Sequence, residues 1–103
     1  MAITKISPDV VDFDAGITIS TTDNTSNLIL TSTDADANIG PVLELYRNSS
    51  SPADSDELGR IYFYGENDND EKMEYVLIRS HIVDASDSSE DSALQVYTYT
   101  AGS

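Results

Sequence analysis

The chain has 103 residues, the length of one domain, and its 19 acidic and 5 basic residues give a formal net charge of −14. With so few cations no positive patch can form, which argues against a nucleic-acid partner and against binding to an anionic membrane. The absence of cysteine excludes disulfides, thiolate metal sites and thiol nucleophiles.

Residues 1–15 are expected to form an N-terminal arm in front of a β module that spans residues 16–103. The arm interleaves apolar residues with aspartates and lacks the apolar block of a secretory signal, so we expect a soluble chain without a leader of its own. Two interpretations stay open: an extended arm that packs its apolar residues on another surface, or a loosely ordered terminus. In the first, the docking residues are Ile3, Ile6, Val10, Val11 and Phe13.

Three short strands are predicted in the first half of the module. GITIS at 16–20 and LILTS at 28–32 alternate apolar and polar residues, and the Asx-rich segment 23–27 between them favours a turn, so together they predict a hairpin. The Asp-rich loop 33–41 ends in Gly-Pro, and the alternating segment 42–47 follows as a third strand.

The second half, from Leu58 to Thr100, predicts an antiparallel meander. The segments LGRIYFYG, KMEYVLIRSHIV and ALQVYTYT are rich in β-branched and aromatic residues and are separated by acidic loops. No helical period competes. The whole chain therefore predicts an all-β fold of short antiparallel strands, a meander or sandwich-like module of fibre type.

The two faces of the predicted meander both look unsuited to water. Side chains alternate along a strand, which gathers the aliphatic residues on one face and five tyrosines with Leu77 on the other. An antiparallel sheet with one wet face should carry small polar residues there. The second face is either a larger core with phenols at its rim or a subunit interface, and we favour the interface because one chain has few apolar residues left to cover both faces. Its residues are Tyr62, Tyr64, Tyr75, Leu77, Tyr97 and Tyr99.

No catalytic or metal site is predicted. The loop 66–71 carries oxygen ligands but lacks the Gly and the distal Glu of an EF-hand, so the acidic loops are interpreted as solvated hairpin tips, with an adventitious divalent ion left open. His81 is the only histidine and no motif supplies it with a nucleophile. We expect no enzyme activity and no cofactor.

Four spaced motifs within residues 16–103 resemble a segment of phage tail-fibre and related virion proteins, of the marine and cyanophage type. They are DADA at 34–37, SPAD-x-D-x-LG-x-I at 51–61, the acidic ND loop at 67–70 and DASD-x-x-ED-x-x-L at 84–94. The resemblance implies a β-rich, trimeric virion-surface module without enzymatic activity, and it carries over no catalytic residue.

The function expected from these features is that of a virion structural protein. The leading hypothesis is a proximal tail-fibre module that self-associates as a trimer, while residues 1–15 attach it to the particle. One alternative is a capsid decoration or head-fibre protein, because such fibre segments commonly continue past the point where this chain stops. A further alternative is a carbohydrate- or receptor-binding module in which tyrosine rings stack on sugars.

Overall fold

The computed structural model of the chain describes residues 13–101. The chain divides into two units, residues 1–42 and 43–103, and each is described by itself. The described residues contain three strands and no helix, which confirms the all-β class. It follows that they include no helix long and apolar enough to cross a membrane.

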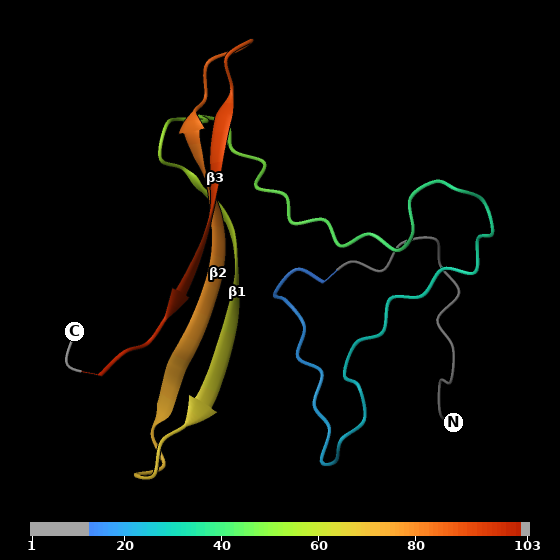
Figure 1. Cartoon of the computed structure of the whole chain (residues 1–103), viewed down its shortest axis with the longest axis vertical. Helices are drawn as coiled ribbons and strands as arrows, with labels where there is room; N and C mark the ends of the chain where they lie inside the picture. Colours follow the sequence, from blue (N-terminus) through green and yellow to red (C-terminus); the bar gives the residue numbers. More distant parts are fainter. Residues whose placement is uncertain (1–12, 102–103) are drawn as a thin grey trace. The chain divides into compact units, whose positions relative to one another are not determined.

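The second unit is built on a three-stranded antiparallel sheet. Strands β1 (Glu57–Glu66), β2 (Lys72–Asp84) and β3 (Asp91–Thr98) lie side by side in the order β1-β2-β3 (Figure 1). This confirms the predicted meander, with boundaries within two residues of those expected. Within residues 43–101 the sheet forms a single layer, so the sandwich and the trimer remain predictions.

Asx side chains hold the two hairpin tips. In the first tip the Asn67 side-chain oxygen accepts hydrogen bonds from the backbone N–H groups of Asn69 and Glu71, at 2.9 and 3.0 Å. In the second, Asp84 Oδ1 accepts one from the Ser86 N–H at 2.9 Å, which lowers the pKa of Asp84. Asn67 and Asp84, which lie at loops predicted as solvated tips, therefore also stabilise the turns, because they pair backbone donors that the ladder leaves free.

Two β-bulges interrupt the pairing of β1 with β2. Near the start of β1 the register passes from Glu57 opposite His81 to Gly59 opposite Ser80, so Leu58 is the extra residue. Near the end of β1 it passes from Phe63 opposite Val76 to Tyr64 opposite Glu74, so Tyr75 is the extra residue on β2. A bulge shifts the alternation of side chains by one position, and each therefore changes which residues share a face.

The three strands expected in the first half of the chain are absent, and those predictions are wrong for the structure described here. Residues 16–20, 28–32 and 42–47 contain no strand. Side-chain bonds close the first turn instead: Asn27 Nδ2 donates to the Ile19 carbonyl at 2.8 Å, and the Thr21 hydroxyl donates to Asn27 Oδ1 at 3.1 Å. Such local bonds compete with a backbone ladder.

Candidate interaction surfaces

The register of the sheet defines two faces. The aliphatic face consists of three rows across the strands, in which Gly59, Ser80 and Leu94 form the first, Ile61, Ile78 and Val96 the second, and Phe63, Val76 and Thr98 the third. Nothing in this set carries a charge. Its large apolar side chains on β1 and β3 are exposed, from 42% for Ile61 to 73% for Leu94, whereas Val76, Ile78 and Ser80 of the central strand are half-buried.

The opposite face, called the tyrosine face, has a different chemistry. Its rows are Arg60, Arg79 and Gln95, then Tyr62, Leu77 and Tyr97. Leu77 lies between the two tyrosines and is the one buried hydrophobic side chain among the described residues, at 8% exposure. The sequence prediction that these aromatic residues share a face is therefore confirmed for Tyr62 and Tyr97 with Leu77.

A hydrogen-bonded network orders the centre of the tyrosine face. Glu57 accepts hydrogen bonds from both Arg60 and Arg79, while Arg60 also donates to the Tyr62 hydroxyl. Arg79 donates to Gln95 Oε1 at 2.9 Å and to the Tyr97 hydroxyl at 3.3 Å. Each guanidinium also lies over the ring of the tyrosine it bonds, 5.6 Å and 5.3 Å from the two centroids.

The network fixes the charge state of Glu57. The hydrogen bond from Arg60, with the further bond from Arg79, lowers the pKa of Glu57 from 4.5 to about 2, against the smaller opposing effect of desolvation. The same contacts raise the pKa of both guanidinium groups. The donors and acceptors at the centre of this face are thus paired with one another before any partner arrives.

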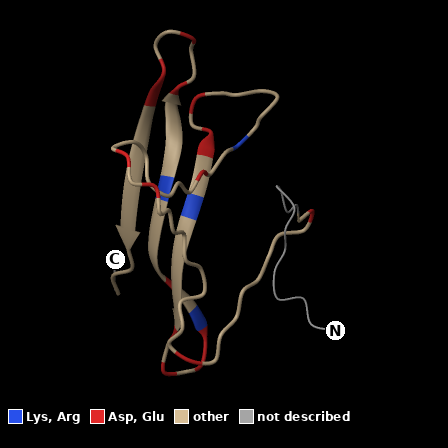
Figure 2. Cartoon of the chain, turned by 90° about the vertical axis from the view of Figure 1, so that its right-hand side faces the viewer, with Lys and Arg blue, Asp and Glu red and all other residues tan. Residues whose placement is uncertain are grey.

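The bulge at Leu58 is what brings Glu57 into this network. Residues 57 and 60 are an odd number of positions apart, so in a regular strand their side chains would lie on opposite faces. The extra residue restores them to the same side. Figure 2 shows the result at the level of charge: basic residues form bands within neighbouring strands, whereas acidic residues gather at strand ends and connections.

Tyr64 extends the tyrosine face toward the first hairpin tip. Its ring centroid lies 5.3 Å from that of Tyr62, and Lys72 Nζ lies 4.5 Å above the Tyr64 centroid. Tyr99 continues the alternation of β3 beyond Tyr97, and its backbone N–H donates to the Tyr75 carbonyl at 3.0 Å. Both phenols are well exposed.

Tyr75 does not join the other tyrosines, which corrects the expected face. A Cβ on Gly65 would lie 3.2 Å from Tyr75 Cε2, so the ring covers Gly65. Gly65 follows Tyr64 in β1, and its Cβ direction is on the side opposite to the Tyr64 ring. The bulge therefore turns Tyr75 toward the aliphatic face, which the alternation in sequence could not reveal.

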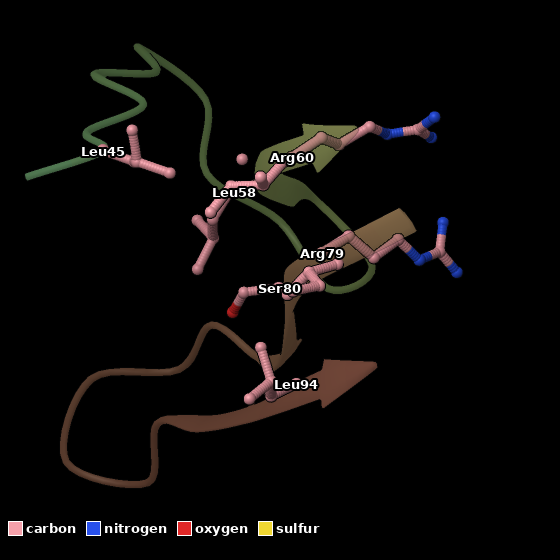
Figure 3. A pocket seen from close by; sticks show the side chains of 9 residues that line it. Leu45, Leu58, Arg60, Arg79, Ser80 and Leu94 are labelled. Atoms are coloured by element: carbon pink, nitrogen blue, oxygen red, sulfur yellow. The ribbon is translucent and has the colours of Figure 1, made fainter. Parts of the chain in front are cut away.

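The aliphatic face contains a shallow groove of about 230 Å³. It is lined mainly by Leu45, Leu58, Gly59, Ile61, Ile78, Ser80 and Leu94, and Figure 3 shows Arg60 and Arg79 extending to the other side of the sheet. Leu45 comes from the segment before β1 and forms one rim of the groove, with Leu94 of β3 at the other. This groove could not be predicted from the sequence, because its rim depends on a contact between segments that are distant along the chain.

The other residues that the sequence singled out form no further site within the described part of the chain. Of the expected docking residues, Ile3, Ile6, Val10 and Val11 lie outside the described residues, and Phe13 is exposed. The described residues hold no group of three or more metal-ligating side chains. His81 lies opposite Glu57 and Ala93, and its buried Nδ1 has no hydrogen-bond partner.

No known family model, curated protein or solved structure matches the chain. The resemblance to virion fibre segments therefore depends on the sequence motifs alone. Those motifs fall on identifiable parts of the fold: the second covers the approach to β1 and its first half, and the third and fourth include the two hairpin tips.

Proposed function

We propose that the chain is a non-enzymatic structural protein of a virion, a proximal tail-fibre module whose copies associate, as a trimer, into a common β-structured core. The observation that carries the proposal is the exposure of both faces of the sheet. Within residues 43–101 a single layer of three strands has Leu77 as its one buried hydrophobic side chain. Three strands acquire independent stability when a hydrophobic face is covered.

The energetics favour association over a solitary sheet. Ordering each residue costs roughly 1–2 kcal/mol of backbone entropy, and burial of apolar area must offset it. On the aliphatic face the side chains of Phe63 and Val96 are more than half exposed. On the tyrosine face the side chain of Tyr64 is half exposed. Contact between copies that covers either face removes apolar area from water and supplies stabilisation that one chain does not.

Attachment to the particle is assigned to the N-terminal arm, residues 1–15. Its apolar residues alternate with acidic ones, which suits an extended segment lying on the surface of a neighbouring virion protein. The alternative, a capsid decoration or head-fibre protein, differs from this proposal only in where the chain attaches to the particle. It would use the same self-associating sheet.

Sedimentation of the full chain at micromolar concentration tests the proposal. We expect an oligomer, with its subunit number given by native mass spectrometry. A stable monomer across the accessible concentration range would remove the physical basis of the proposal. If the chain is an oligomer, imaging of it within a whole particle would distinguish a tail protein from a capsid protein.

One observation favours a second candidate, a carbohydrate- or receptor-binding surface. The rings of Tyr62 and Tyr64 are neighbours on an exposed face, and Arg60 of the network donates a hydrogen bond to the Tyr62 hydroxyl. Aromatic faces of this kind can stack on sugar rings. A glycan array that stays silent while the oligomer is intact would eliminate this candidate.

A further inference from the structure

We propose that the aliphatic face, and not the tyrosine face, is the surface through which two copies of this chain meet. The inference rests on the proposed self-association and deepens it by assigning a surface to the contact. It departs from the sequence prediction, which placed the subunit interface on the tyrosines. Three properties of the two faces lead to it.

The first property is the cost of removing each face from water. In the three rows of the aliphatic face, Ser80 and Thr98 supply the only polar side chains, and charged groups are absent. The tyrosine face carries Glu57, Arg60 and Arg79, and their mutual attraction offsets only part of the cost of desolvating them. Their bonds are already made in the exposed sheet. The aliphatic face therefore gains more from being covered.

The second property is charge, which selects the occupant. Each copy carries a net charge of −14, so identical chains repel one another wherever their acidic residues approach. The acidic residues gather at strand ends and connections, whereas the aliphatic rows are neutral (Figure 2). A basic partner would be drawn to the acidic strand ends and connections and would gain nothing further from the neutral rows. A second copy finds there a surface that it can approach without placing like charges in contact.

The third property is shape. The groove between Leu45 and Leu94 is concave and apolar, and Leu94 at its rim is the most exposed large apolar side chain of the three rows, at 73%. The face thus has both a recess and a projecting apolar residue. Copies that turn this face toward a common threefold axis can each place the projecting residue in the recess of the next copy, a heterologous contact that closes into a ring.

Two neighbouring residues of β3 provide a matched test, because Val96 and Tyr97 lie on opposite faces of one strand. The variants V96S and Y97S are compared with the wild type by sedimentation equilibrium, and circular dichroism checks that each retains its strands. We expect V96S to raise the dissociation constant of the oligomer by about tenfold or more, since it buries a hydroxyl in an apolar contact. We expect Y97S to change it by less than about threefold.

An equal or larger effect of Y97S, or an unchanged dissociation constant for V96S, would overturn the inference while leaving self-association intact. A monomeric wild type would instead contradict the proposed function itself. If V96S loses its strands, radical footprinting of the wild type replaces it: Leu94 and Phe63 should lose reactivity on assembly, and Tyr62 and Tyr97 should keep theirs. Protection confined to the tyrosines would overturn the inference.

Discussion

The side chain of Leu45 lies directly over Gly59, and a Cβ at Gly59 would come within 3.3 Å of Leu45 Cδ1 and 3.4 Å of its Cβ. The contact joins the segment before β1 to the sheet and builds one rim of the groove. Two residues further on, the Arg47 guanidinium donates to the Glu57 carbonyl at 3.0 Å and lies 3.5 Å from the Asp56 carboxylate. Residues 45–47 thus attach to β1 through one apolar and one polar contact, and to Asp56 just before it through an ion pair.

Replacement of Gly59 by valine is expected to displace Leu45 from the sheet. The new side chain would overlap an apolar neighbour, and overpacking of this kind costs about 1–3 kcal/mol, partly offset by the β propensity of valine. We expect a net loss of roughly 1 kcal/mol in urea unfolding and a change in the environment of the Leu45 methyl groups in NMR spectra. Gly40→Val is the control, because nothing lies within 4 Å of a Cβ at Gly40. Unchanged methyl resonances in G59V would contradict the assigned contact.

Glu57→Gln is expected to reduce stability at neutral pH and to flatten its dependence on pH. The pKa of Glu57 is about 2 in the fold against an ordinary value of 4.5. A depressed pKa means that the ionised carboxylate stabilises the folded state above pH 4.5, and that this contribution is lost as the pH falls toward 2. The difference between wild type and variant in thermal midpoint should therefore shrink over that interval.

The matched control for this prediction is Glu90→Gln, which removes one negative charge from the second connection. The Glu57 difference should exceed the Glu90 difference at pH 7, and the two should converge at the acid end. All measurements are made at one protein concentration, since the proposed association would contribute to the apparent stability. A pH-independent difference between E57Q and the wild type would mean that the carboxylate charge does not stabilise the sheet.

The meander could be predicted from the sequence because alternation and turn chemistry agree over residues 58–100. The bulges could not, since one extra residue in a ladder leaves no mark on the pattern of residue types. They nevertheless decide the chemistry of both faces, because one brings Glu57 to the arginines and the other takes Tyr75 away from the remaining tyrosines. The alternation of apolar and polar residues also predicted strands in the first half of the chain that do not form. Side-chain hydrogen bonds, such as that from Asn27 Nδ2 to the Ile19 carbonyl, take the place of a backbone ladder there.

Ser88→Gly is expected to stabilise the fold slightly. Ser88 occupies the second hairpin tip with a φ of 74°, a left-handed conformation that costs an L-residue roughly 1–2 kcal/mol. Glycine removes this strain but adds about 0.5–1 kcal/mol of chain entropy in the unfolded state. The net gain should be about 0.5 kcal/mol in urea unfolding. Asp87→Gly adds the entropy without relieving strain, so it should destabilise, and a loss of stability in S88G would contradict the turn geometry.

Added sodium chloride is expected to strengthen the oligomer. Copies of charge −14 repel one another, and the proposed contact is apolar, so screening weakens the opposing force without weakening the attraction. Between about 20 mM and 500 mM salt the Debye length falls several-fold, and we expect the dissociation constant to fall by roughly tenfold. Chloride is used because sulfate would strengthen apolar burial by its exclusion from the surface. The variant D68N, with one acidic residue fewer in the first tip, should depend less steeply on salt. Dissociation by salt would instead indicate that ion pairs hold the copies together, and it would direct attention to the arginines of the tyrosine face.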